Sequence, residues 1–134
     1  MSIVFNSQKQ FFHLQADTVS YVIKLERGLY PSSAYWGDRL NDWNGSSNPV
    51  YVDRPFEPNP ISTDRAFSLD TIPQEYPTFG STDFRSPACQ LRLEDGSTIS
   101  NFIYQSHRIF SGKPVLSGLP SVYIENENEA DTLE

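Results

Sequence analysis

Apolar and polar side chains alternate most regularly near the start of the chain. Over residues 18–27 alternate positions are apolar, at Val19, Tyr21, Ile23 and Leu25. This period of two predicts a β-strand with one buried face. Two shorter apolar runs, at 3–5 and 11–15, flank the polar cluster 6–9 and predict a hairpin. Residues 33–37 predict a further short strand.

A tight-turn signal stands in the second half of the chain. The dipeptide Asp95-Gly96 lies between apolar segments at 89–94 and 98–104. It suits the positive backbone angles of a two-residue turn, so we predict an antiparallel hairpin here. Cys89 alternates with polar residues in step with the leucines of its segment, which favours a buried strand position over a reactive thiol.

The end of the chain predicts two more strands, at 107–110 and 121–125. The acidic stretch 125–134 has two interpretations: a disordered tail, or a turn before a strand that starts at Thr132. The second accounts for the apolar residue Leu133. Six to eight short strands result, and the predicted fold class is all-β, an antiparallel β-sandwich.

Two segments do not match a regular element. Residues 38–64 are dominated by Asn, Asp, Ser, Gly and Pro, and loops of this length in compact domains are usually functional or mobile. The segment Ser68–Ala88 is rich in proline and charge, but it also carries apolar residues that need burial, namely Leu69, Ile72, Tyr76, Phe79 and Phe84. We expect this segment to lie against another surface.

Composition narrows the classes of function. The 134 residues are enough for one compact domain, and 37% of them are hydrophobic. A net charge of -7 disfavours nucleic acid and anionic membranes as partners. No apolar run is long enough to span a membrane, and the N-terminus lacks the pattern of a signal peptide, so we expect a cytoplasmic protein. The single cysteine allows no disulfide within the chain.

Catalytic and metal-binding patterns are weak. His13 and His107 are too few for a zinc-type cluster and are interpreted as ordinary strand or turn residues. Glu75, Asp83 and Arg85 resemble an acid/base set with a cation, but a structural salt bridge is the default in such a segment. The sequence has no nucleophile signature, phosphate loop or dinucleotide fingerprint, and no cofactor is expected.

Several short motifs occur in a fixed order: Tyr35-Trp36-Gly37, Val52-Asp-Arg-Pro-Phe56, Asp70-Thr-Ile-Pro-Gln-Glu-Tyr-Pro77, Asp83-Phe-Arg-Ser-Pro-Ala88, His107-Arg-Ile109, Gly112-Lys-Pro114 and Gly118-Leu-Pro120. Together they resemble the N-terminal domain of bacterial α-galactosidases of glycoside hydrolase family 36. The resemblance implies a β-supersandwich, here truncated, that precedes a catalytic (β/α)8 barrel and a small C-terminal β-sandwich.

The resemblance also implies an activity for the parent enzyme. Such enzymes remove terminal α-1,6-linked galactose from melibiose or raffinose with retention of configuration. A retaining glycosidase needs two carboxyl groups about 5 Å apart. In the family both are aspartates of the barrel, which is absent from this chain. Residues 1–134 are therefore expected to be a single domain, or part of one, without catalytic residues.

The family resemblance points to Asp53 as a substrate contact. Family members form homotetramers in which a loop of one N-terminal domain reaches a neighbouring subunit's active site, and Asp53 matches that loop. Arg65 is a weaker candidate. From the residues alone, two other interpretations of Asp53 are open: a solvated loop carboxylate or an ion-pair partner of Arg54. Internal pairing of Arg65 with Asp64 or Asp70 explains that residue equally well.

Two other functions remain open, a free-standing carbohydrate-binding module and a small enzyme. Trp43 and Tyr51 flank the same loop, and planar rings stack on sugar faces. Trp43 is the better candidate for an exposed platform, although packing against a neighbouring domain fits it equally. Trp36 is interpreted as a core residue because of its strand context.

Overall fold

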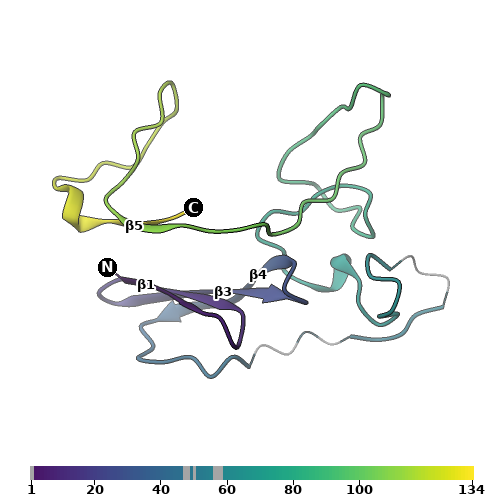
Figure 1. Cartoon of the computed structure of the whole chain (residues 1–134), viewed down its shortest axis with the longest axis horizontal. Coiled ribbons are helices and arrows are strands. Elements are labelled where there is room, and N and C mark those ends of the chain that lie inside the picture. The colour runs from purple at the N-terminus through teal and green to yellow at the C-terminus, as the bar shows by residue number, and fades with distance from the viewer. Residues whose placement is uncertain (1, 47–48, 50, 56–58) are drawn as a thin grey trace.

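The computed structural model describes residues 2–46, 49, 51–55 and 59–134 and shows an all-β chain (Figure 1). The described residues form a four-stranded antiparallel sheet and a separate antiparallel pair. The elements in chain order are β1 Ser2–Asn6, β2 Phe11–Gln15, β3 Val19–Glu26, β4 Tyr30–Asp38, the 3-10 helix η1 Leu69–Thr71, β5 Ile109–Ser111, the 3-10 helix η2 Glu127–Glu129 and β6 Asp131–Leu133. The predicted all-β class and antiparallel pairing are confirmed.

The first sheet follows the alternation in the sequence closely. The hairpin of β1 and β2 turns at the predicted polar cluster, where Oδ1 of Asn6 accepts hydrogen bonds from the amides of Gln8 and Lys9. Strands β3 and β4 pair along their whole length, with a bulge between Val22 and Ile23. β4 is longer than the predicted 33–37 because β3 provides partners for it from Tyr30 onward.

Each face of this sheet packs against a different part of the chain. On one face, the rings of Phe5 and Phe12 stack at 4.6 Å, and His107 lies 4.5 Å and 4.8 Å from them. On the other, Phe11 and Val22 are buried against Trp43. The core is therefore divided by the sheet, since neighbouring side chains of a strand point to opposite faces.

A second layer crosses the first face of the sheet (Figure 1). The ribbon from residue 104 runs into β5, which pairs with β6, and β6 contacts β1. The strand expected from Thr132 is confirmed and begins one residue earlier, so the tail interpretation is wrong. Of the predicted 107–110, strand geometry starts only at Ile109, and 121–125 is not a strand.

The predicted hairpin around Asp95-Gly96 forms its turn but not its strands. The amide of Leu93 donates to the carbonyl of Ser97 at 2.8 Å, and the rest of 89–104 has no strand assignment. Cys89 is half-buried and Leu93 exposed, so the prediction of a buried strand position at Cys89 is wrong. The physical reason is that no neighbouring strand among the described residues covers this segment.

The proline-rich segment Ser68–Ala88 meets its expected surface only in its first part. Leu69 and Ile72 are buried against Tyr30 and Phe67. Main-chain hydrogen bonds from Ser33 to Pro73 and from Glu75 to Pro31 fasten the segment to β4. Its later apolar side chains, Tyr76, Phe79 and Phe84, are exposed.

Candidate functional site

The structure brings the two candidate site residues together. Nη2 of Arg65 lies 3.5 Å from Oδ1 of Asp53, and their side chains are 71% and 55% exposed. Arg54 bonds to Asp70 instead of Asp53, and Asp64 bonds to Arg27. The pairings suggested for Asp53 with Arg54, and for Arg65 with Asp64 or Asp70, are therefore not those of the fold. An exposed pair of this kind adds little stability, which leaves both groups available to a ligand.

Tyr51 anchors the loop on the N-terminal side of this pair. Its hydroxyl donates to Oε2 of Glu26 at 2.8 Å, and its ring lies 5.7 Å from the ring of Phe67. The guanidinium of Arg27 lies 4.7 Å from the Tyr51 ring centre. Burial, followed by the hydrogen bond and charge of Glu26, raises the pKa of Tyr51 well above its usual range, so the hydroxyl stays a donor.

Asp70 anchors the other side of the loop by binding Arg54, the residue that follows Asp53. Its Oδ1 accepts hydrogen bonds from Arg54 at 2.8 Å and from Ser68 at 2.6 Å. Burial acts to raise the pKa of Asp70, but these two hydrogen bonds and the charge of Arg54 outweigh it and hold the pKa below its usual value. The carboxylate is thus ionised at neutral pH and fixes Arg54, the neighbour of Asp53.

The base of the adjoining segment is held by the pair of Asp83 and Arg85, as predicted. Asp83 is fully buried, and its Oδ2 lies 2.6 Å from Nη2 of Arg85. Gln74 donates to the same oxygen at 2.8 Å. Nη2 of Arg85 also donates to the carbonyls of Leu69 and Ile72. Glu75 is not part of this network. Burial, followed by a hydrogen bond with Glu75, raises the pKa of Tyr21 to about 12.

The two tryptophans lie opposite to expectation. Trp43 is buried, 8% exposed, because its ring packs edge-on against Phe11 at 4.7 Å. Trp36 is 71% exposed, although it lies in β4 opposite Tyr21. Its position explains the difference, since β4 is an edge strand of the sheet and Trp36 is paired with β3 on one side only. The proposed platform of Trp43 is therefore absent.

His13 lies in a strand, as interpreted, whereas His107 lies just before β5, outside the strands and turns. His13 is buried in β2, where its Nε2 lies 3.0 Å from Oγ of Ser20. Nδ1 of His107 lies 2.6 Å from the hydroxyl of Tyr104. Over the described residues, no three His, Cys, Asp or Glu side chains are placed to hold a metal ion.

Sequence reasoning missed the residues that hold the loop in place. Glu26 and Tyr51 are 25 residues apart, and Arg54 and Asp70 are 16 apart. No local pattern signals such contacts, because they depend on how the loop returns across the end of β3. The sequence shows which charged residues are available to form ion pairs, but it does not show which of them pair with each other.

The comparisons with known proteins agree with this fold. The model of the glycosyl hydrolase family 36 N-terminal domain matches residues 29–134. Alpha-galactosidase AgaA of Geobacillus stearothermophilus is 51% identical over 100% of this chain, and alpha-galactosidase Mel36A of Lactobacillus acidophilus is 39% identical over 98% of it. The crystal structure of the family 36 alpha-galactosidase AgaB from Geobacillus stearothermophilus superposes with a TM-score of 0.86 over 99% of this chain, at 52% identity.

The chain is much shorter than these relatives. It spans 18% of AgaA, of Mel36A and of the AgaB chain. No helix among the described residues is long and apolar enough to cross a membrane. The match to the family model over most of the chain, with the all-β fold and the superposition on AgaB, leads to one assignment: this chain belongs to the N-terminal domain family of the family 36 glycosyl hydrolases.

Proposed function

We propose that this chain is the non-catalytic N-terminal part of an α-galactosidase that hydrolyses terminal α-1,6-galactosides with retention. The chain's family and its 51% identity with a Geobacillus alpha-galactosidase support the activity class. A variant of that relative was crystallised in complex with raffinose. The catalytic residues belong to a barrel domain that these residues do not include. The N-terminal domain contributes to the assembly of the enzyme into a homotetramer.

The contribution of this domain to the reaction is substrate positioning by Asp53, with Arg65 beside it. The observation that supports this role is their shared, exposed position at 3.5 Å on a loop fixed on both sides. A carboxylate accepts two hydroxyl hydrogen bonds and a guanidinium donates several, which matches the hydroxyl groups of galactose. Groups fixed in this way orient a sugar without the cost of ordering a loose loop.

Replacement of Asp53 in the intact enzyme tests this role. Asp53→Ala is expected to lower kcat/KM for raffinose about 10- to 100-fold, because a hydrogen bond to a charged group is worth about 1.5–3 kcal/mol. Asp17→Ala removes an exposed carboxylate from the turn between β2 and β3 and is the matched control. Unchanged kinetics in a correctly assembled Asp53 variant would return the residue to a solvated surface role.

Subunit mixing tests whether Asp53 acts on a neighbouring subunit. An Asp53→Ala subunit is combined with a subunit that lacks the catalytic nucleophile of the barrel. If each active site takes its barrel from one subunit and Asp53 from another, hybrid tetramers contain some complete sites, and the activity exceeds the sum of the separate samples. Activity equal to that sum would show that Asp53 acts within its own subunit or not at all.

The alternative of a free-standing carbohydrate-binding module is weaker. Trp43, the residue predicted to stack on a sugar, packs against Phe11 instead. The ring of Tyr51 contacts the ring of Phe67 and the guanidinium of Arg27. Calorimetric titration of the isolated chain with galactose and raffinose separates the two functions. The proposal expects no saturable binding, since the sugar contact forms only in the assembled enzyme.

A further inference from the structure

Asn44 and Gly45 lie in the loop that follows Trp43, and they are the only Asn-Gly pair in the sequence. The side chain of Asn44 is exposed, whereas Trp43 before it is buried. Glycine has no Cβ, so the preceding side chain can approach its backbone nitrogen closely. The pair therefore allows a reaction between the Asn44 carboxamide and the backbone of the next residue.

The carboxamide of Asn44 is turned toward that backbone and polarised. Its Oδ1 accepts a hydrogen bond from the amide of Ser46 at 2.9 Å and another from Oγ of Ser46 at 2.6 Å. The ring that the first of these bonds closes contains both Cγ of Asn44 and the nitrogen of Gly45. Two donors on Oδ1 also stabilise negative charge on this oxygen, as in an oxyanion hole.

The peptide between Asn44 and Gly45 is polarised as well. Nζ of Lys9 donates to the main-chain carbonyl of Asn44 at 2.9 Å. This oxygen and the Gly45 nitrogen belong to one resonant peptide group, so a cation on the oxygen stabilises the charge left when the nitrogen loses its proton. Within the described part of the chain, the Gly45 amide donates no hydrogen bond that would have to break first.

The fold brings Lys9 to this place from 35 residues earlier in the chain. Its backbone is fixed in the turn between β1 and β2, where its amide donates to Oδ1 of Asn6 at 2.9 Å. Its stem lies along the loop, since a Cβ added to Gly45 would lie 2.9 Å from Cδ of Lys9. The contact with Lys9 is thus added to the Asn-Gly sequence by the tertiary structure alone.

We propose that Asn44 is a site of spontaneous deamidation through a cyclic imide formed with Gly45. The Gly45 nitrogen gives its proton to water and bonds to Cγ of Asn44, while the π electrons of the side-chain carbonyl move onto Oδ1. When this adduct collapses, the bond from Cγ to Nδ2 breaks, and Nδ2 takes a proton from water and leaves as ammonia. A water molecule then opens the imide at either carbonyl carbon and leaves aspartate or isoaspartate at position 44. The net reaction consumes one water and releases one ammonia, with no oxidant or reductant.

The pair Asp95-Gly96 has a similar sequence but a different environment. The amide of Gly96 donates to the carbonyl of Leu93 at 2.9 Å, so this nitrogen is already engaged. Asp95 also offers a carboxylate instead of a carboxamide, and its negative charge opposes attack by an amide anion. The structure therefore favours the reaction at Asn44 over a reaction at Asp95.

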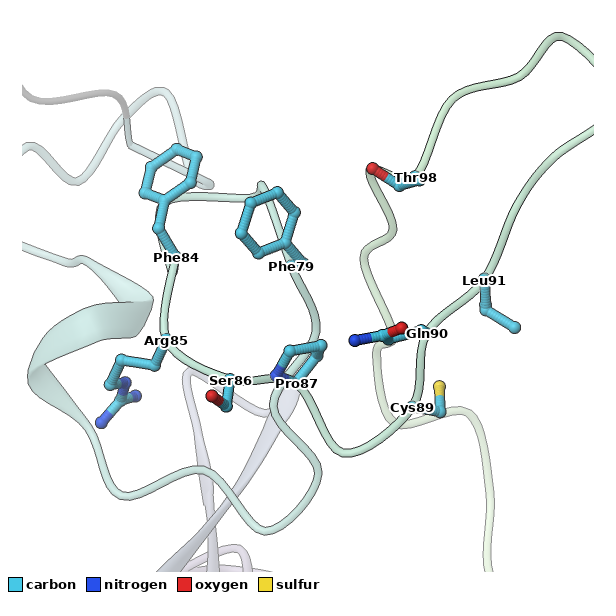
Figure 2. A pocket seen from close by; sticks show the side chains of 9 residues that line it. All are labelled: Phe79, Phe84, Arg85, Ser86, Pro87, Cys89, Gln90, Leu91 and Thr98. Atoms are coloured by element: carbon cyan, nitrogen blue, oxygen red, sulfur yellow. The ribbon is translucent and has the colours of Figure 1, made fainter.

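Cys89 is the other side chain with a chemistry of modification, and its surroundings disfavour a reaction. It borders a hollow of about 410 Å³, on the side opposite Phe79 and Phe84 (Figure 2). The reactive form of a thiol is the thiolate, which a nearby cation favours. Arg85 also lines this hollow, but its Nη2 is paired at 2.6 Å with the buried carboxylate of Asp83.

The products of the reaction at Asn44 alter the loop in two ways. Both add a negative charge to a chain whose net charge is already -7, beside the ammonium of Lys9. Isoaspartate also lengthens the backbone directly after Trp43, whose ring packs against Phe11 at 4.7 Å. Isoaspartate is therefore expected to disturb the seating of Trp43 more than aspartate does.

Peptide mapping by mass spectrometry tests the reaction in the folded, intact protein during incubation in mildly alkaline buffer. Asn41, which is exposed and is followed by Asp42, is the internal reference. Asn44 is expected to convert at least about tenfold faster than Asn41, to both aspartate and isoaspartate, at a rate that rises with pH. Equal conversion of the two residues would overturn the proposal. Aspartate without isoaspartate would also overturn it, because direct hydrolysis of the carboxamide forms no imide.

Substitution of Lys9 separates the effect of the fold from that of the Asn-Gly sequence. Lys9→Met removes the ammonium and is expected to slow conversion of Asn44 about threefold in the folded protein. Lys9→Arg keeps the charge and should keep most of the rate, and Lys113→Met, at an exposed lysine elsewhere, is the matched control. In urea all four proteins should convert at one rate, because unfolding removes the contact. A folded Lys9→Met protein that reacts as fast as the parent would contradict the promotion by Lys9.

Discussion

Asp83 is a carboxylate that the fold has removed entirely from water. Burial acts to raise its pKa, but the hydrogen bonds and charge of Arg85, with a hydrogen bond from Gln74, hold that pKa below its usual value. Asp53 is also paired with an arginine, but both groups face solvent. Both pairs join an aspartate to an arginine, but they have opposite uses, because burial decides whether a charge pair fixes the backbone or remains open to a ligand.

Alanine at these two positions should separate the roles. Asp83→Ala is expected to lower the free energy of unfolding by about 2–4 kcal/mol, since it leaves Gln74 and Arg85 without their shared acceptor. Asp53→Ala is expected to change it by less than about 0.5 kcal/mol. Urea denaturation of the isolated chain measures both, and equal losses would contradict the assigned roles.

His13 gives the chain a pH dependence near neutrality. Burial lowers its pKa below 6.5, and the charge of Asp42 offsets part of this effect. Because the folded pKa lies below the unfolded one, His13 favours folding fully above about pH 6.5. The free energy of unfolding should fall, by at most about 1.4 kcal/mol per pH unit from this group, as pH drops from 6.5 through the folded pKa.

Denaturation at a series of pH values checks this expectation, with His13→Gln as the comparison. The variant should lose the slope just below pH 6.5, because its side chain does not titrate. It should keep the later fall in more acidic solution, where Asp70 and Asp83, whose pKa values are lowered, begin to take up protons. An identical slope in both proteins would show that His13 is not its source.

At the scale of elements, two glycines act in different ways on the arm formed by residues 89–104: Gly80 packs against Ile99 of the arm, and Gly96 lies in its turn. Both have positive φ, +95° at Gly80 and +83° at Gly96. A Cβ at Gly80 would lie only 2.8 Å from Cγ1 of Ile99 and 3.2 Å from its Cβ, whereas a Cβ at Gly96 meets nothing within 4 Å. Gly80 therefore serves close packing as well as backbone conformation.

Alanine substitution distinguishes these two demands. Gly96→Ala should cost about 1–2 kcal/mol, the strain of a left-handed conformation alone. Gly80→Ala should cost a further 1–3 kcal/mol or so, since Ile99 has to move. Thermal or urea unfolding of the two variants gives the difference. If Gly96→Ala were the more damaging, the close approach of the arm to Phe79 and Gly80 would be wrong.

The arm also shows how far elements follow from local sequence. Its turn was predictable because Asp95-Gly96 has a conformational preference of its own. Its strands were not, because a strand needs partners, and the described chain supplies none along most of the arm. In β1 to β4 the same alternation succeeded, since each segment is followed by another that pairs with it.

On the scale of the whole molecule, the isolated chain should not hydrolyse α-galactosides. Retaining hydrolysis needs two free carboxyl groups facing one another across about 5 Å. The principal acidic side chains beside the loop are instead bonded to cations, at Asp53, Asp64, Asp70 and Asp83. A chromogenic α-galactoside assay on the purified chain is expected to show no turnover above the buffer rate. Turnover that co-purifies with the chain and is lost on unfolding would contradict the non-catalytic assignment.

The sequence by itself determined the β class, the first hairpin, the long third strand and the family, because alternation, turn residues and motif order are local properties of the chain. Only the tertiary structure decided which charges pair and which aromatic residues are buried. Trp43 is buried although its sequence neighbours are polar, and Trp36 is exposed although it lies in a strand. The pairing of Asp53 with Arg65, two residues that are not neighbours in the sequence, was likewise decided by the fold. Burial and ion pairing depend on segments distant in sequence, and their energies are fixed only when the fold brings those segments together.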